Sequence, residues 1–459
     1  MIASETLIQV MLDNRELVAS KKVFPRETEI GTFPRYVLVG VRRSGKSYLL
    51  YQKIQSLLVN GKSWDDMLYL NFEDERLLGF DVSDFNSILS CHTQISGKKD
   101  YPILFLDEIQ IIDGWERFAR RMADTGLEIY ITGSNAKMLS TDVAAVLGGR
   151  FMSINVFPLS FGEFLGFKNI PSDLASRLST AGTALIKNGF SQYLRFGGFP
   201  ECAEFQNPRE YLNSILQKVY IGDIAVRNKV ENLYALRVLL KKIAESVGQP
   251  VSYTRLTRIV TAVGVSLAKN SCISYLNFAQ QACLILRLDN IIGKLSDRES
   301  NPKFYFVDTG LIELLKQDNL SDQLENLVAI ELLRRYGREE AVFFYKRDIE
   351  VDFYIPEEKI GIQVCVRLGT DPDTIAREIG AFDKMEKEVE LKRRIIITSD
   401  EEKTLRCDMG DITVIPAWKW LLDVGICQDT SKKLVRSLFT PEEPQQGLCP
   451  YASLPQDIF

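Results

Sequence analysis

The sequence predicts an α/β protein that begins with a mostly parallel sheet and continues into further modules. Two observations indicate this fold class. Five apolar segments within residues 1–158 alternate with spacers long enough for helices, and a glycine-rich turn joins the first segment to a helix-like one. Such strands pair in parallel through right-handed crossovers, with helices on both faces. The 459 residues are enough for about three domains of roughly 150 residues each.

The composition is that of a globular protein, and it excludes several classes of function. Hydrophobic residues make up 46% and charged residues 25%, which is enough to form several cores. The net charge of -5 excludes a chain that coats nucleic acid along its whole length, so any basic surface must be local. The single histidine, His92, excludes His-based triads and His-rich zinc sites within one chain.

Cysteine spacing and hydropathy favour a cytoplasmic location. The eight cysteines are dispersed without a CxxC pair, which disfavours zinc knuckles and disulfide frameworks and is typical of a reducing compartment. The N-terminal segment contains the acidic Glu5 and lacks the basic start and apolar core of a signal peptide. No apolar run reaches the roughly 18 residues of a membrane span. We therefore expect a cytoplasmic protein with no membrane partner.

The glycine-rich turn has the sequence GVRRSGKS and fits the phosphate-binding pattern GxxxxGK[ST]. An apolar strand at 36–39 precedes it and a helix from Lys46 to Leu58 follows, so that backbone N–H groups and the helix N-terminus converge on one point. We expect Lys46 to neutralise the β and γ oxygens of ATP, Ser47 to ligate Mg²⁺, and Gly45 to allow a close backbone approach. The predicted nucleotide-contacting residues are Gly40, Val41, Arg42, Arg43, Ser44, Gly45, Lys46, Ser47 and Tyr48.

The run ILFLDE is an apolar strand followed by two acids, and the first of these, Asp107, lies 61 residues after Lys46. Parallel strands present their carboxyl ends at the edge where ligands bind, so we expect Asp107 to enter the magnesium shell and Glu108 to polarise the attacking water. The alternative is that both acids only cap the strand. The next strand, EIYITGSN, delivers Ser134 and Asn135 to the same edge, where Asn135 is expected to hold the water or contact the γ-phosphate.

These motifs resemble those of a known family. GVRRSGKS, FLDEIQ, ITGSNAKML, GGRFMSINVFPLSFGEFL and GGFPE are similar to segments of prokaryotic AAA-type ATPases with a C-terminal domain of unknown function, and the resemblance extends to about residue 420. It implies an ATPase core, a helical connector, a winged helix and a domain similar to PD-(D/E)xK nucleases. It also implies that Arg150 reaches a neighbouring subunit's γ-phosphate; the alternative is an ion pair within the subunit. Arg42 matches an arginine that the family often has in its loop.

The expected modules are a P-loop core at 1–158, a helical connector at 159–207, a winged helix-turn-helix at 208–308, a nuclease-like α/β domain at 309–422 and a tail at 423–459.

The basic charge is concentrated in the expected winged helix. Residues 206–300 contain 13 Lys and Arg against 7 Asp and Glu. Apolar residues recur at helical spacing up to position 263, Gly264 breaks the run, and Ser266 is the expected N-cap of a second helix. Alternating stretches at 284–292 and 304–307 indicate a hairpin wing. The candidate DNA contacts are Lys269, Asn270 and Ser274. The alternative is a helical domain that packs against protein.

The C-terminal module retains part of a nuclease motif. PD-(D/E)xK nucleases need an acid on a helix, an acid on the first core strand and an ExK on the next, because carboxylates must hold the metal while a lysine stabilises the charged transition state. Glu325 and Asp352 match the first two positions, but Gln363 and Cys365 replace the acid and the lysine. Lys346 is a poor substitute because it lies on a different strand. We therefore expect a nuclease-like fold without cleavage.

The sequence leads to two functional hypotheses. The first is an Mg-dependent ATPase whose nucleotide state repositions the attached modules, with a homo-oligomer implied if Arg150 acts on a neighbour. The second is a nucleotide-gated DNA-binding regulator in which slow or vestigial hydrolysis serves as a timer.

Overall fold

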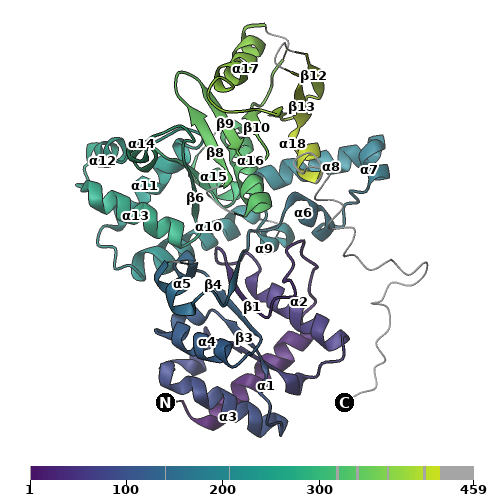
Figure 1. The fold of residues 1–459 in the computed structure, drawn as a ribbon, viewed down its shortest axis with the longest axis vertical. Helices are drawn as coiled ribbons and strands as arrows, with labels where there is room; N and C mark the ends of the chain where they lie inside the picture. The colour runs from purple at the N-terminus through teal and green to yellow at the C-terminus, as the bar shows by residue number, and fades with distance from the viewer. Residues whose placement is uncertain are drawn as a thin grey trace. The chain divides into compact units, whose positions relative to one another are not determined.

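The computed structural model describes residues 2–139, 141–205, 207–316, 320–337, 341–369, 372–406 and 410–423 (Figure 1). The chain up to Leu422 forms one compact unit. Apart from Asp423, the expected tail at 423–459 lies outside the described residues. Within the described ranges, no helix combines the length and the apolar character needed to cross a bilayer.

The N-terminal sheet is entirely parallel, as predicted, with the strand order β2-β3-β4-β1-β5. The order places β1 next to β4 and β5, so the loop after β1 leaves the sheet beside the ends of both neighbours. The strands are β1 (Arg35–Val39), β2 (Met67–Asn71), β3 (Ile103–Asp107), β4 (Ile129–Gly133) and β5 (Met152–Asn155).

Helices cover both faces of this sheet, which explains why its strands are continuous apolar runs. Figure 1 shows them around β1, β3 and β4. On β1, Val37 and Val39 join the core formed with α1, α3 and α4, whereas Leu38 joins the core on the α2 side. Alternate residues of a strand point to opposite faces, so both sets are buried. These helices are α1 (Ser4–Ser20), α2 (Lys46–Val59), α3 (Phe85–Ser96) and α4 (Trp115–Asp124).

Shorter elements complete the connections of the N-terminal part. They are η1 (Trp64–Asp66), η2 (Glu75–Leu77), η3 (Val82–Asp84), η4 (Ile109–Ile111), η5 (Ala136–Leu139) and α5 (Thr141–Leu147).

The expected connector is helical. It contains α6 (Phe161–Phe167), α7 (Leu174–Leu178), α8 (Thr180–Phe196) and α9 (Pro200–Glu204). A capping box starts α6: the Ser160 hydroxyl accepts from the Glu163 N–H, and the Glu163 carboxylate accepts from the Ser160 N–H. This reciprocal pair holds Glu163 at the start of α6. Glu163 also accepts a hydrogen bond from Arg26, which precedes β1.

The following segment contains the helix pair and the antiparallel ribbon that the sequence predicts. Strands β6 and β7 pair antiparallel, and α12 packs against α13. Its identity as a winged helix stays a prediction. The elements are α10 (Pro208–Lys218), the π-helix η6 (Val219–Val226), α11 (Leu233–Glu245), α12 (Tyr253–Ala262), α13 (Lys269–Gln281), β6 (Ile285–Leu288), α14 (Leu295–Ser300) and β7 (Lys303–Phe306).

The predicted N-cap at Ser266 is wrong. Helix α13 begins at Lys269, with Ala268 as its N-cap and no side-chain cap. Residues 265–268 have no regular structure, and Leu267 among them is 8% exposed. Burying Leu267 stabilises a connection that extends to residue 268. This effect outweighs the preference of Ser266 for the N-cap position, which would start the helix earlier.

The C-terminal part is a mixed six-stranded sheet with the order β12-β13-β11-β10-β9-β8. Strands β10, β11 and β13 are mutually parallel, and the other pairs are antiparallel. The elements are α15 (Thr309–Leu315), α16 (Leu320–Tyr336), β8 (Phe343–Lys346), β9 (Glu350–Ile355), β10 (Ile360–Val364), α17 (Pro372–Met385), β11 (Arg393–Thr398), β12 (Lys403–Leu405), β13 (Ile412–Pro416) and α18 (Ala417–Leu422).

Candidate phosphate-binding site

Two glycines make the loop between β1 and α2 possible. A Cβ at Gly40 would lie 2.1 Å from the Val156 carbonyl oxygen, because β5 runs directly alongside. Gly45 has a φ of 97°, in the left-handed region that favours glycine, and immediately precedes α2. The loop therefore delivers the first N–H groups of α2 to its concave side, which is the geometry that holds anions at helix N-termini.

Lys46 folds back over this loop. Its Nζ donates to the carbonyl oxygens of Gly40 at 3.0 Å and Val41 at 3.2 Å, and the residue is only 4% exposed. Within the described part of the chain, the buried Ser44 hydroxyl has no hydrogen-bond partner. Buried polar atoms are normally paired, so a free hydroxyl here fits a loop that binds a polar ligand. Tyr48, in contrast, lies partly exposed on α2.

Asp107 lies at the end of β3, fully buried beside the loop. It accepts hydrogen bonds from the Tyr69 hydroxyl at 2.7 Å and from the Thr132 hydroxyl, and it also hydrogen-bonds the Ser47 side chain. Burial and the neighbouring Glu108 raise the pKa of this carboxyl group. The structure thus brings the two predicted magnesium ligands, Ser47 and Asp107, into contact.

Glu108 follows in an unusual backbone conformation, with a φ of 53° and only 6% of its surface exposed. Its Oε1 lies 3.5 Å from the Lys46 Nζ, and its Oε2 accepts from Gln110 at 2.5 Å. Burial would raise the pKa of Glu108, but the Lys46 ammonium and the hydrogen bonds outweigh this effect and lower it. A strained backbone that aims an ionised carboxylate at the loop lysine is typical of a functional site.

Asn135 is at the same sheet edge, as expected, and is 9% exposed. Its Oδ1 accepts from the Lys137 N–H at 2.8 Å, which closes the turn after β4. Its role toward water or phosphate stays a prediction.

Arg150 lies elsewhere. It pairs with Asp124 at 2.5 Å, and its carbonyl oxygen accepts from Arg35 at the first residue of β1. It therefore sits at the amino edge of the sheet, opposite the loop. The ion pair within the subunit is present, and a role at a neighbour's phosphate stays a prediction.

Sequence reasoning missed Arg26, a buried cation that supports the loop from behind. Its Nη1 donates to the Ser44 carbonyl oxygen at 3.0 Å, its Nη2 to the Phe157 carbonyl oxygen at 2.9 Å, and its Nε to Glu163 at 2.8 Å. Arg26 thereby joins the phosphate loop to the segment after β5, at Phe157, and to the start of α6, at Glu163. No local spacing announces this residue, because Glu163 is 137 residues away in the chain.

The two loop arginines are also held by acids from outside the loop. Arg42 pairs with Asp223 on η6 and with Glu73, and Arg43 pairs with Glu201 on α9 at 2.8 Å. Both arginines belong to the predicted nucleotide-contacting set, and both side chains bind carboxylates in this structure.

A second cluster lies in the C-terminal part, where Glu325 and Asp352 come together as predicted. The fully buried Lys303 of β7 lies between them and Glu350. Its Nζ is 3.3 Å from Glu325, 2.7 Å from Glu350 and 3.7 Å from Asp352. The Tyr305 hydroxyl also donates to Glu325, at 2.8 Å. No pattern in the sequence indicates Lys303, because β7 precedes the expected nuclease-like module.

Gln363 and Lys346 make contacts within the C-terminal sheet. Gln363 accepts from the Asp352 N–H at 3.0 Å and donates to the Glu350 carbonyl oxygen at 3.1 Å, which joins β9 to β10. Lys346 pairs with Glu350 at 2.6 Å. Burial raises the pKa of Cys365 to about 12. Among the described residues, no group of three or more His, Cys, Asp or Glu side chains is arranged to hold a metal ion.

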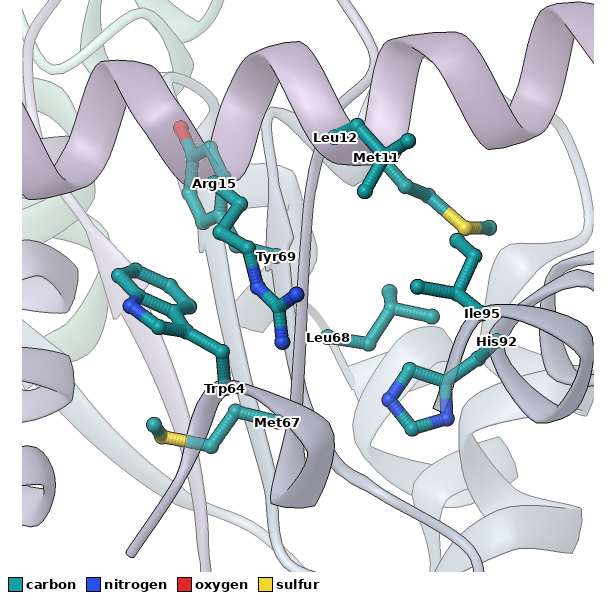
Figure 2. Close-up of a pocket in the computed structure, with 9 residues that line it drawn as sticks. All are labelled: Met11, Leu12, Arg15, Trp64, Met67, Leu68, Tyr69, His92 and Ile95. Atoms are coloured by element: carbon teal, nitrogen blue, oxygen red, sulfur yellow. The ribbon is translucent and has the colours of Figure 1, made fainter. Parts of the chain in front are cut away.

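A cavity between α1, β2 and α3 is lined in part by the single histidine, His92. Figure 2 shows Arg15 extending from α1 beside Trp64, with His92 farther along the cavity wall. The Arg15 guanidinium lies 5.5 Å from the Trp64 ring centre. The cavity volume is about 30 Å³, which is enough for water and too small for a nucleotide.

The chain matches two family models. Residues 32–165 match one described as an AAA domain, and residues 187–326 match a domain of unknown function (DUF8612). A solved structure of the Walker-type ATPase PABY2304 of Pyrococcus abyssi aligns with a TM-score of 0.36 and 14% identity, over 65% of this chain and 99% of that one.

Two relatives are themselves uncharacterised. One, from Haemophilus influenzae, is 34% identical over 308 residues, which cover 65% of this chain and 74% of the relative. The other is protein MJ1544 of Methanocaldococcus jannaschii, which is 34% identical over 430 residues, 90% of this chain and 94% of the relative. The chain therefore contains an AAA-type P-loop domain and belongs to the same family as MJ1544.

Proposed function

We propose that this protein hydrolyses ATP to ADP and phosphate in an Mg-dependent reaction. The observation that supports this proposal best is the convergence of four side chains at one sheet edge. Lys46 and Ser47 come from the start of α2, and Asp107 and Glu108 from the end of β3, with Lys46 3.5 Å from Glu108 and Ser47 hydrogen-bonded to Asp107. Phosphoryl transfer needs little more than such an arrangement of positioned charges.

Each residue then has a role that follows from its chemistry. The N–H groups of the loop bind the phosphate oxygens, and Lys46 exchanges its carbonyl contacts for the β and γ oxygens. Glu108 orients a water molecule and accepts its proton while the water oxygen bonds to the γ-phosphorus and the bond to the β–γ bridging oxygen breaks. The lowered pKa of Glu108 keeps this carboxylate ionised and able to accept a hydrogen bond from the water.

The site also fits a magnesium ion. Mg²⁺ prefers oxygen ligands and is usually held by one or two protein oxygens together with phosphates and water. Ser47 and Asp107 would hold the ion, and it would neutralise charge on the β and γ oxygens. A divalent cation would also favour the ionised form of Asp107, which burial disfavours.

Two substitutions test the proposal. Glu108→Gln should retain ATP binding and lower the hydrolysis rate at least about 100-fold, because the water loses its proton acceptor. Lys46→Ala should abolish ATP binding. Lys53→Ala, which removes a cation from the same helix away from the loop, is the matched control and should retain both properties. Binding is measured by calorimetry and turnover by phosphate release, and unchanged hydrolysis by Glu108→Gln would contradict the role of Glu108.

A second candidate function is DNA binding by the α12–α13 pair, as part of a nucleotide-gated regulator. The observation that favours it is a group of exposed polar side chains, Arg255, Arg258, Lys269 and Asn270, on the two helices next to the β6–β7 ribbon. Ser274, the third predicted contact, is half-buried.

Binding to duplex DNA at two salt concentrations tests this candidate. Phosphate contacts release counterions, so the affinity should fall steeply with salt, and Lys269→Ala should reduce that slope by about one. Lys99→Ala, an exposed lysine between α3 and β3, serves as the control and should change neither quantity. If the protein does not bind DNA at low salt, the DNA-binding candidate is excluded.

A further inference from the structure

Arg42, inside the phosphate loop, is gripped by carboxylates from distant parts of the chain. Its Nε and Nη2 donate to the two oxygens of Asp223 at 3.1 and 3.2 Å, and its Nη1 donates to Glu73 at 2.5 Å. The pair with Asp223 is two-pronged, and Asp223 is only 4% exposed. Such a pair is stronger and more specific in geometry than a surface ion pair between flexible side chains.

An irregular helix brings Asp223 to this place. The eight residues of η6, Val219–Val226, form a π-helix that directly continues α10. π-Helices are rare and occur mostly as single turns at functional sites, because their hydrogen bonding is less favourable than that of an α-helix. In η6, the buried acid that this irregularity places against the phosphate loop is Asp223.

Asp223 has a second cation available on its own helix. The Nη2 of Arg227 lies 3.5 Å from Oδ1 of Asp223. A buried carboxylate without a cation is strongly unfavourable. If Arg42 turns away, Arg227 still pairs with the Asp223 carboxylate. The neighbouring Arg43 pairs with Glu201, and both side chains of this pair are more than one third exposed. Arg43 can therefore leave its partner at limited cost, and Arg227 lowers the cost of separating Arg42 from Asp223.

We propose that Asp223 is a positioning residue that withholds Arg42 from the nucleotide, so that phosphate groups in the loop compete with Asp223 for this guanidinium. This inference rests on the proposed nucleotide-binding function and adds a means of regulating it. Arg42 is near enough to the site to act on Glu108 through its charge. Any factor by which phosphate weakens the Arg42–Asp223 pair must equal the factor by which the pair weakens nucleotide binding. The α10–η6 segment would thereby respond to nucleotide occupancy.

The affinity for a non-hydrolysable ATP analogue with Mg²⁺, measured by calorimetry, tests the proposal. Asp223→Asn keeps the size of the side chain and removes its charge, so the Kd should fall on the order of fivefold. In an Arg42→Gln background the same substitution should have no effect, because it acts through Arg42. Glu231→Gln removes an equal charge from an exposed position between η6 and α11 that is not a partner of Arg42, and it should leave the Kd unchanged.

Hydrogen exchange of residues 219–226 provides a second readout. The analogue should accelerate exchange in the wild-type protein, and Asp223→Asn should show the faster exchange without nucleotide. An unchanged or higher Kd for a natively folded Asp223→Asn protein would overturn the proposed competition while leaving ATP binding intact. Absence of binding by the wild-type protein itself would instead refute the proposed function, and the coupling with it.

Discussion

At the scale of single residues, Lys303 explains the chemistry of the C-terminal acids. The carboxyl groups of Glu325, Glu350 and Asp352 all lie within 3.7 Å of the Lys303 Nζ. Without a cation these acids would repel one another strongly, and the Lys303 ammonium of β7 is that cation. Burial would lower the pKa of Lys303, but the three acids outweigh this and raise it, so the lysine stays charged. Lys303 therefore holds Glu325 and Asp352 together, and the loss of cleavage stays a prediction.

Replacing Lys303 with Met should destabilise the protein by about 3–5 kcal/mol, because it leaves three partly buried carboxylates without their fully buried cation. The loss should shrink at acidic pH, where these carboxylates take up protons. Adding Glu350→Gln and Asp352→Asn should restore much of the stability. Thermal unfolding of the three proteins measures this, and an unchanged melting temperature of the Lys303→Met protein would refute the role of Lys303.

At the scale of elements, Asp308 joins the turn after α8 to the start of α15. It is the N-cap of α15, accepting from the Gly310 N–H at 2.9 Å, and its other oxygen accepts from the Gly198 N–H at 2.7 Å. A Cβ at Gly197 would overlap this carboxylate, so the turn requires glycine. Burial raises the pKa of Asp308 to about 7, although both backbone hydrogen bonds act in the opposite direction.

This raised pKa predicts a pH-dependent contribution to stability. The folded-state value of about 7 exceeds the ordinary value of 3.8, so the contribution is complete below about pH 4 and is lost as the pH rises through 7. The stability difference between the wild-type protein and Asp308→Asn should therefore decline from pH 4 to pH 8. Denaturant unfolding at several pH values measures it, and a pH-independent difference would contradict the raised pKa.

At the scale of the whole molecule, the positions of Arg150 and of the phosphate loop bear on assembly. The phosphate loop lies at the carboxyl ends of the strands of the five-stranded sheet, and Arg150 lies at their amino ends. Arg150 therefore does not face the loop of its own subunit. If it contributes to hydrolysis at the phosphate, a second copy of the chain must present it.

We predict that the ATPase rate per subunit rises with protein concentration and that Arg150→Ala holds it at the value of the diluted protein. Asp124→Ala, which removes only the partner of Arg150, should keep the concentration dependence. Phosphate release measured over a wide range of concentrations decides between the alternatives. A rate that is independent of concentration and unaffected by Arg150→Ala would restrict this arginine to its ion pair with Asp124.

The sequence by itself determined the parallel sheet, the phosphate loop and the two acids that face it. Their signals are local: Lys46 and Ser47 follow a glycine turn, Asp107 and Glu108 end an apolar run, and parallel strands bring such ends to one edge. The misplaced cap at Ser266 shows the limit of local signals, because the burial of Leu267 set the start of α13.

Only the tertiary structure decided which charges meet across the chain. Arg42 pairs with Asp223, which is 181 residues away in the chain, and Arg26 pairs with Glu163, which is 137 residues away. Lys303 pairs with acids that belong to other helices and strands. An ion pair between two modules depends on how they pack, and packing leaves no mark on the spacing of either partner in its own segment. The partners of the loop arginines, the support behind the loop and the cation of the acidic cluster therefore came from the fold alone.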